Sequence, residues 1–329
     1  MRVPLAGGTQ ETLLSEVGPV LLPFFTTRDA CALRLVCREF LAAVSEHPWE
    51  DRDTVIMGSI GAWRACFLRA RCANVQKWAR GSAEERAASV VDADFVHFVG
   101  LRELYMASCR GVTDAAFVHL RGIHTLDMSF CDQPAITDAA FAHLAGVQRL
   151  SIRRCSQPAI TDAAFVHLRG IKMLNMSECR QLTDAAFVHL RGIHTLYMWY
   201  CNQLAITDAA FAHLRGIQLL NISDCPQLTD AAFAHLRGIR TLYMWGCRQP
   251  AITDAAFAHL RGIHTLVMEG CAQAAITGAA FTHLKSAIQV LGMHECSDEQ
   301  VAAARSLGLP VSTRACALYG ALCITLEAP

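Results

Sequence analysis

Clusters of lysine and arginine are missing from this sequence. Only 18% of its residues are charged, and 29 Lys and Arg balance 29 Asp and Glu, which leaves no formal net charge. Proteins that bind nucleic acids neutralise phosphates with a basic patch or stripe. We therefore expect no nucleic-acid partner.

Long apolar runs are missing as well. The longest one, from Ala315 to Leu326, is shorter than the ~20 apolar residues that a membrane-spanning helix needs. The first four residues, Met-Arg-Val-Pro, do not form a basic segment that leads into an apolar run, as a signal peptide does. We expect neither a membrane partner nor a secretory leader.

Motifs typical of catalytic, phosphate-binding or metal-binding sites are missing too. The sequence shows no Cys-x-x-Cys pair, no phosphate-cradling glycine loop, no nucleophile–base pair and no pair of catalytic carboxylates. It has 15 cysteines, an odd number, and a disulfide framework would not place one cysteine in each copy of a repeat. We expect a protein that is not an enzyme, holds no cofactor or metal, and resides in the reducing cytoplasm or nucleus. The repeated cysteines are Cys109, Cys131, Cys155, Cys179, Cys201, Cys225, Cys247, Cys271 and Cys296.

The chain is rich in one repeated sequence motif. One copy reads Ile-Thr-Asp-Ala-Ala-Phe-Ala-His-Leu over 136–144 and continues to Leu-Ser-Ile-Arg-Arg-Cys over 150–155. Successive copies start 22 or 24 residues apart, and the last step is 20 residues. Self-similarity at such a period is the signature of a solenoid, in which each unit packs only against its neighbours.

Each copy predicts a short helix followed by a short strand. Thr137 is suited to cap the helix, and Asp138 places negative charge at the positive end of the helix dipole. In most copies an Arg-Gly pair, such as the one at 121–122, ends the helix. Leu126 and Met128 then alternate with polar residues, which is the period of a strand with one buried face. Stacked copies would build a parallel sheet on one side and helices on the other, with the cysteines as a buried column.

The pattern Leu-x-Met-x-x-Cys followed by Ile-Thr-Asp resembles the cysteine-containing leucine-rich repeat. The resemblance covers residues 91–296, although Met or Ile replaces the second strand leucine and Phe replaces the usual helix leucine. It implies an α/β solenoid, a horseshoe with a parallel concave sheet. We expect residues 53–90 to be a helical connector and N-terminal cap, with helical spacing at Trp63 and Phe67 and again at Val75 and Trp78. We expect residues 297–329 to be the C-terminal cap.

Residues 13–52, after a loose tail over 1–12, resemble an F-box. The resemblance lies in the apolar run at 20–25, the acidic helix start Asp29, the run Leu-Arg-Leu-Val-Cys-Arg at 33–38, and Trp49; the opening at 15–19 departs from the family, and Pro23 interrupts the first helix. It implies a small all-helical domain that docks a Skp-type adaptor of a cullin ubiquitin ligase. Cys31 and Cys37 are expected in its core. The alternative is a plain helical cap on the first repeat. The implied adaptor contacts are Leu21, Leu22, Phe25, Leu33, Val36 and Phe40.

A histidine occupies the same slot in nine repeats, which raises the hypothesis of a metal-binding enzyme. Neighbouring helices stand about 8–10 Å apart, and no thiolate or carboxylate column is clearly placed to complete a metal shell. A structural or surface role is the expectation, and the parallel Asp column is interpreted as helix-start chemistry. The histidines are His97, His119, His143, His167, His189, His213, His235, His259 and His283.

The strand positions that face away from the core vary from copy to copy. Exposed Trp, Tyr and Arg near the middle of a concave surface resemble binding hot spots, so we expect a protein target to bind there. The alternative is drift after a tandem duplication, because residues 161–206 and 207–252 match almost throughout. The expected target-binding residues are Phe130, Arg153, Arg154, Tyr197, Trp199, Tyr200, Tyr243 and Trp245.

Beside the metal-binding enzyme, these patterns give two leading hypotheses of function. The first is a non-catalytic substrate-recognition subunit of a Skp–cullin–F-box type ubiquitin ligase, as the resemblance implies. The second is a free-standing leucine-rich-repeat scaffold or inhibitor whose N-terminal helices only cap the solenoid. The two hypotheses differ in the role of residues 13–49, which bind an adaptor in the first and only cap the solenoid in the second.

Overall fold

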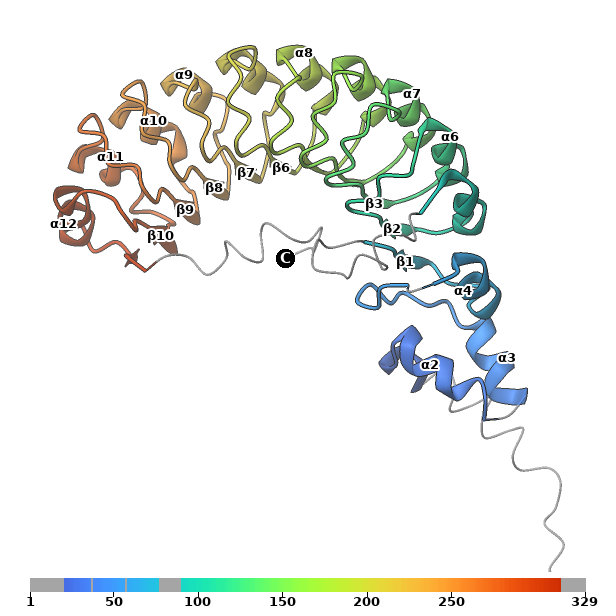
Figure 1. Ribbon diagram of the computed structural model, residues 1–329. Coiled ribbons are helices and arrows are strands. Elements are labelled where there is room, and N and C mark those ends of the chain that lie inside the picture. The colour runs from blue at the N-terminus through green and yellow to red at the C-terminus, as the bar shows by residue number, and fades with distance from the viewer. Residues whose placement is uncertain (1–20, 37, 57, 77–89, 315–329) are drawn as a thin grey trace, which may run out of the picture.

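The helix–strand units stack side by side into an arc. The computed structural model describes residues 21–36, 38–56, 58–76 and 90–314. All strands of the described chain join one parallel sheet in the order β1 to β11, so the sheet lines the inner side of the arc and the short helices its outer side (Figure 1). The expected solenoid with a parallel concave sheet is confirmed.

Strands of three residues recur once in each unit. They are β1 (Cys72–Asn74), β2 (Glu103–Tyr105), β3 (Thr125–Asp127), β4 (Arg149–Ser151), β5 (Met173–Asn175), β6 (Thr195–Tyr197), β7 (Leu219–Asn221), β8 (Thr241–Tyr243), β9 (Thr265–Val267) and β10 (Val290–Gly292), followed by the two-residue β11 (Val311–Ser312). The pairing is in register throughout, so that equivalent residues such as Leu126, Leu150 and Leu174 lie side by side.

Within the repeats the helical layer consists of single α-turns, 3₁₀ turns or both, and longer α-helices lie at the two ends of the described chain. The α-helices are α2 (Thr27–Leu33), α3 (Arg38–Glu46), α4 (Ile60–Cys66), α6 (Asp114–Phe117), α7 (Asp138–Phe141), α8 (Asp184–Phe187), α9 (Asp230–Phe233), α10 (Asp254–Phe257), α11 (Gly278–Thr282) and α12 (Asp298–Ser306). The 3₁₀ helices are η1 (Leu22–Phe24), η2 (Asp92–Phe98), η3 (Val118–Leu120), η4 (Ala142–Leu144), η5 (Asp162–Leu168), η6 (Val188–Leu190), η7 (Asp208–His213) and η8 (Ala258–Leu260). No helix in the described part of the chain is both long and apolar enough to cross a membrane.

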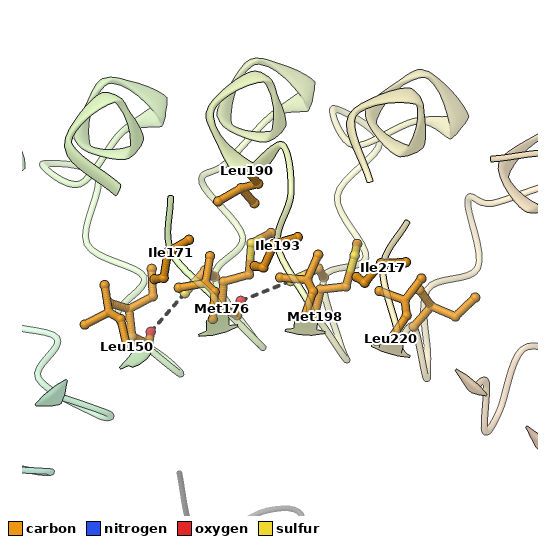
Figure 2. Close-up of a cluster of buried hydrophobic side chains, with 14 of the residues drawn as sticks. Leu150, Ile171, Met176, Leu190, Ile193, Met198, Ile217 and Leu220 are labelled. Carbon is orange, nitrogen blue, oxygen red and sulfur yellow. Dashed lines mark hydrogen bonds between the residues drawn. The ribbon is translucent and has the colours of Figure 1, made fainter. Parts of the chain in front are cut away.

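One continuous core fills the space between the two layers. The methionines that directly follow the strands, such as Met176 and Met198, meet Leu190 from the helical layer (Figure 2). The helix phenylalanines, Phe187 among them, are fully buried in the same core. Since truncation of a buried Phe to Ala removes about 3–5 kcal/mol, each repeat depends on the neighbours that cover its ring.

The local signals for the helix ends are confirmed. The Thr137 hydroxyl accepts a hydrogen bond from the Ala139 backbone N–H at 3.1 Å, and the equivalent threonines do the same. Gly122 has φ of +82°, a left-handed conformation in which a glycine carries no strain. The sequence therefore places each helix correctly, although each is only about one turn long.

The aspartate column has a second role that the sequence interpretation missed. Asp114 accepts hydrogen bonds from Thr137 of the next repeat, at 2.7 Å from the backbone N–H and 2.6 Å from the hydroxyl. The same pair of bonds recurs from Asp92 to Asp254, and we call this series the Asp–Thr ladder. Gly278 stands at the next Asp position, so the ladder ends there. Each Asp thus joins two repeats rather than only starting one helix.

Two further series of hydrogen bonds cross the repeat boundaries. The thiol of Cys201 donates to the Met176 carbonyl at 3.2 Å, and the other strand-end cysteines donate to equivalent carbonyls. Gln203 donates to the carbonyls of Cys179 and Leu182, both at 3.1 Å. Burial raises the pKa of Cys201 to about 12, so the thiol keeps its proton and remains a donor. The expected buried cysteine column is confirmed from Cys109 to Cys271, whereas Cys296 at its end is only half-buried. An added finding is that these thiols are hydrogen bonded.

The segment 60–76 differs from the sequence expectation. Its helix α4 contains Trp63, but residues 72–74 form strand β1, which pairs with β2 in the sheet. The helical interpretation of Val75 is therefore wrong, and Trp78 lies outside the described residues. The sheet starts before the repeats that the sequence reveals, because pairing with β2 does not require the Leu-x-Met pattern. At the other end α12 and β11 continue the alternation, whereas residues 315–329 lie outside the described part.

The N-terminal helices also differ in detail. The helix that the sequence places at Asp29 is α2, which ends at Leu33, and a turn at 34–36 precedes the second helix α3. Cys31 is exposed rather than in a core, and Cys37, together with the tail over 1–12, lies outside the described residues. Trp49 is buried with Leu22 and Phe67 in a small second core, where its indole N–H donates to the Val44 carbonyl at 2.7 Å.

We expect the Asp–Thr ladder to contribute measurably to stability. Asp184→Ala removes two bonds to Thr207 and leaves its backbone N–H without a partner, so the free energy of unfolding should fall by about 1–3 kcal/mol. Urea unfolding followed by circular dichroism measures the change. Asp132→Ala is the control, because this exposed carboxylate makes only a 3.9 Å contact with Arg110 and should change stability by less than about 0.5 kcal/mol. Equal losses in the two variants would contradict the ladder's role.

Candidate binding surface on the concave face

The concave face is built from the strand residues that do not point into the core, together with the second and third residues after each strand. The third residue adopts a left-handed backbone, with φ of 60° at Phe130, 60° at Arg154 and 56° at Tyr200. This conformation is rare for residues with a side chain. The turns thus place bulky side chains at the edge of the concave sheet, where repeats differ from one another.

Arg153 lies at the centre of an aromatic cluster on this face. Its guanidinium carbon is 4.4 Å from the centroid of the Trp199 ring and 5.0 Å from that of Phe130. Arg154 also lies over Phe130, at 5.7 Å. Cation–π contacts of this kind contribute roughly 0.5–2 kcal/mol each, depending on how far the pair is removed from water. The three sequence-predicted residues Phe130, Arg153 and Trp199 are therefore brought together.

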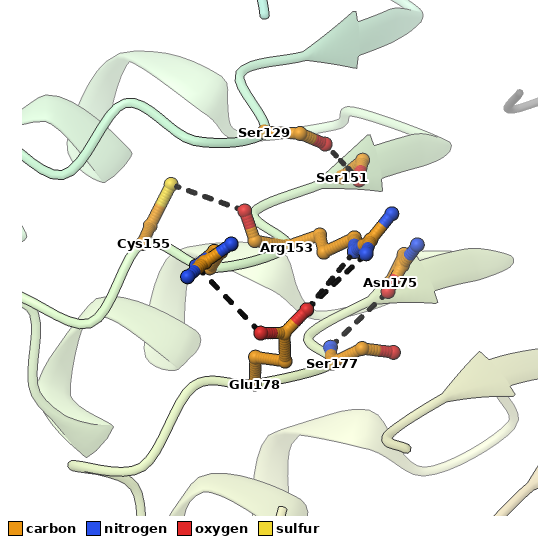
Figure 3. Close-up of polar contacts among 8 residues, drawn as sticks. Ser129, Ser151, Arg153, Cys155, Asn175, Ser177 and Glu178 are labelled. Carbon is orange, nitrogen blue, oxygen red and sulfur yellow. Dashed lines mark hydrogen bonds and ion pairs between the residues drawn. The ribbon is translucent and has the colours of Figure 1, made fainter. Parts of the chain in front are cut away.

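Glu178 holds the two arginines in place. One of its carboxylate oxygens lies 3.2 Å from a terminal nitrogen of Arg153, toward which it points in Figure 3. The other lies 3.6 Å from Nε of Arg154. Only 15% of the Arg153 side chain is exposed, whereas 59% of that of Arg154 is exposed. Arg154 is thus the arginine of the pair that a partner can contact directly. The expectation of two available arginines needs that correction.

The aromatic residues on the next strands are partly covered. Trp199 and Tyr200 make an edge-to-face contact with centroids 5.2 Å apart. Tyr197 is only 7% exposed, because it packs with Met173 and has Trp199 and Leu219 beside it. The expectation that Tyr197 is exposed is therefore wrong, although its ring lies on the concave side and not inside the stack. Tyr243 and Trp245 are half-buried.

A polar network forms the floor beside the aromatic cluster. The buried Asp127 carboxylate accepts from the backbone N–H of Ser129 at 2.9 Å and from its hydroxyl, and the Ser129 hydroxyl meets that of Ser151 at 2.7 Å. Burial raises the pKa of Asp127, while the bonds from Ser129 and the charge of Arg153 oppose that rise. The burial of Asp127 is not visible in the sequence.

The histidine column lies on the outer, helical side. There Nε of Arg121 donates to Nδ1 of His143 in the next repeat at 3.4 Å, and similar contacts join Arg169 with His189 and Arg191 with His213. Within the described residues no group of three or more His, Cys, Asp or Glu side chains is arranged to hold a metal ion. These histidines interact with arginines between repeats.

The residues expected to bind an adaptor divide into two sets. Leu22 is buried and Leu33 packs against the small N-terminal core, so neither presents its side chain to a partner. Leu21, Phe25 and Val36 are exposed, and Phe40 is half-buried. Sequence reasoning missed Phe24 and Leu35, which are 83% and 88% exposed; two apolar residues next to Phe25 and Val36 were the available signal.

No family model matches this sequence, and no curated protein matches it either. Among solved structures the chain is similar to TLR13 in its complex with ssRNA13, with a TM-score of 0.53 and 14% identity, over 70% of this chain and 36% of that chain. It thus spans little more than a third of that chain's length. This likeness shows the fold, which is a leucine-rich-repeat solenoid.

Two more distant likenesses were found. A chain of the yeast complex of Rad7 and Elc1 aligns with a TM-score of 0.38 and 12% identity, over 94% of this chain and 99% of that one. A chain of the Drosophila complex of Toll and Spatzle aligns with a TM-score of 0.42 and 9% identity, over 84% of this chain and 48% of that one.

Asp127 should make stability depend on pH. A carboxyl whose pKa is raised in the folded state binds its proton more tightly there than in the unfolded chain, so stability falls as pH rises through the window above the ordinary pKa. Asp127→Asn keeps the acceptor for Ser129 but cannot ionise, so the variant should gain stability relative to the wild type between pH 3 and pH 7. Thermal unfolding over that range measures the difference.

Asn175→Ala is the matched control for this effect. Asn175 accepts from the Ser177 backbone N–H at 3.1 Å, as Asp127 accepts from Ser129, but it does not titrate. Removal of the Asn175 side chain should shift the curve of stability against pH without changing the slope. A wild-type curve parallel to that of Asp127→Asn would show that the buried carboxyl does not govern the slope.

Proposed function

We propose that this protein is a non-catalytic substrate receptor of a Skp–cullin–F-box type ubiquitin ligase. The N-terminal helices dock a Skp-type adaptor, and the concave face holds a protein target. The receptor catalyses nothing itself and acts by raising the effective concentration of the target near the ligase. The cytoplasm or nucleus suits this role, because the described cysteines are all free thiols.

The observation that carries the adaptor half of the proposal is the apolar surface of the N-terminal helices. Leu22, Ala30, Val44 and Trp49 already bury the inner face of these helices. Phe24, Leu35 and Val36 remain outside, and a plain cap has no use for them. Exposed apolar side chains that gather in one segment favour a protein interaction site.

The target half of the proposal is supported by the division of labour within each repeat. Core and ladder positions keep nearly the same residue from copy to copy, whereas the concave positions change. The changing positions include Trp199, Tyr200, Arg154 and Trp245, and Trp, Tyr and Arg are the residue types that carry most binding energy in protein interfaces. Arg153 and Glu178 hold the central part of this surface in one arrangement, which lowers the entropic cost of binding.

The second candidate is a free-standing scaffold or inhibitor. It uses the same concave face, so the variable positions favour it equally. It differs only in that the N-terminal helices then need no partner, and the exposure of Phe24, Leu35 and Val36 weighs against it.

The adaptor contact can be tested with the full chain. Phe24→Ser combined with Val36→Ser should weaken binding to a Skp-type adaptor by about tenfold or more, because both side chains are exposed and apolar. Isothermal titration calorimetry measures the affinity. Leu68→Ser combined with Leu204→Ser is the matched control, since these leucines are exposed elsewhere on the molecule. If the wild-type chain does not bind the adaptor at micromolar concentration, the ligase proposal is wrong.

The target surface needs a separate test. Trp199→Ala combined with Trp245→Ala should leave the circular dichroism spectrum nearly unchanged, since both rings lie half-buried on the concave side. It should reduce capture of the proteins that co-purify with the wild type by about tenfold, as quantitative mass spectrometry measures.

Val118→Ala combined with Val188→Ala is the control for the outer face, where both valines are exposed on the helical layer. This pair should leave capture unchanged. Loss of the folded signal in the tryptophan variant would show that the rings are part of the core. Unchanged capture by a folded tryptophan variant would place the target elsewhere.

A further inference from the structure

A polar pocket lies at the N-terminal ends of the first four strands, away from the aromatic cluster. Its volume is about 280 Å³. The first residues of β1 to β4 are paired side by side along it, namely Cys72, Glu103, Thr125 and Arg149. The residues just before three of these strands, Arg71, Arg102 and His124, together with Glu50, complete the lining.

The two carboxylates of the pocket are already engaged. One carboxylate oxygen of Glu103 accepts a hydrogen bond from a terminal nitrogen of Arg52 at 2.7 Å. The other accepts one from the Tyr105 hydroxyl at 3.2 Å. Glu50 lies 3.5 Å from Arg71. Among the residues that the structure describes, neither Arg102 nor Arg149 has an ion-pair partner. The pocket therefore carries positive charge that the described side chains do not neutralise.

The lack of a partner is most costly for Arg149. Its Nε and Nη2 atoms are buried and have no hydrogen-bond partner among the described residues. These two atoms form one edge of the guanidinium, the fork that meets two oxygens of a carboxylate or phosphate side by side. A buried N–H group that lacks a partner costs about 1–3 kcal/mol, and more when it is charged.

The position of Arg149 within the repeat is unusual. It is the only arginine among the first residues of the described strands, where the others include Thr125, Met173 and Leu219. The next strand places Met173 directly beside it, which is 9% exposed and offers no polar atom that can pair with a cation. Arg149 also lines the pocket, so an acceptor for its guanidinium can come from that side.

We propose that this pocket binds an oxyanion, a phosphate or carboxylate group, which the Nε–Nη2 edge of Arg149 holds side-on. Arg102 adds a second positive charge at the pocket, and the Thr125 hydroxyl is a further donor in its lining. The oxyanion accepts hydrogen bonds from the buried edge of Arg149 and neutralises the positive charge of the pocket. The site is independent of the adaptor contact and of the concave aromatic cluster.

Inorganic phosphate is the first probe. At constant ionic strength in chloride, phosphate should raise the thermal unfolding temperature of the wild-type chain, because a ligand that binds only the folded state stabilises it. Arg149→Met should lose that phosphate-dependent rise, with affinity weakened about tenfold or more. It should unfold in phosphate-free buffer at the same temperature as the wild type or higher, because methionine at the equivalent Met173 position is tolerated.

Matched variants separate the site from general ionic effects. Arg180→Met removes an exposed arginine outside the pocket and should keep the full response to phosphate. A response that persists in Arg149→Met, or that disappears in Arg180→Met as well, would overturn the proposal. So would a wild-type chain that responds to neither phosphate nor acetate. Titration with O-phosphoserine and with an N-acetylated tripeptide that has a free carboxylate then distinguishes a phosphate ester from a chain terminus as the source.

Discussion

The contact that orders this molecule is the pair of hydrogen bonds that the Thr of one repeat donates to the Asp of the repeat before it. One helical turn and one three-residue strand cannot bury a core alone, so each unit must be held in a fixed position against its neighbour. Asp184 does this at the start of a helix by accepting both the backbone N–H and the hydroxyl of Thr207. The thiol of Cys201 and the side-chain amide of Gln203 also donate hydrogen bonds to carbonyls of the preceding repeat and so fix neighbouring units in the same way.

The curvature of the arc follows from the two layers that these bonds join. Adjacent strands lie about 4.8 Å apart, whereas packed helices need roughly 8–10 Å. The outer layer must therefore be longer than the inner one, and the sheet takes the concave side (Figure 1). Curvature brings side chains of neighbouring strands together on the inner face, which is how Tyr197 becomes covered by Met173 and Leu219. It also gathers Phe130, Arg153 and Trp199, which come from three different repeats, into one cluster.

How much of this the sequence predicts depends on whether a signal is local. Thr137 as a cap, Leu126 and Met128 as a buried strand face, and the cysteine column are all visible in the repeat, because each follows from neighbours along the chain. Features that depend on pairing between repeats are not visible. Strand β1 has no leucine pattern and exists because β2 pairs with it. The bonds from Asp to Thr, the burial of Tyr197 and the unpartnered edge of Arg149 all depend on residues about 20 or more positions away.

The two ends of the proposed receptor are joined through packing and not through a loose linker. Trp63 of α4 packs against the small N-terminal core, where Trp49 and Phe67 are buried, and also against the main core of the solenoid. Strand β1 of the same unit belongs to the concave sheet. The exposed surface of the N-terminal helices therefore has a fixed orientation relative to the face that carries Arg153 and Trp199. In the proposed role of substrate receptor, such a fixed geometry would convert the capture of a target into its presentation to the ligase.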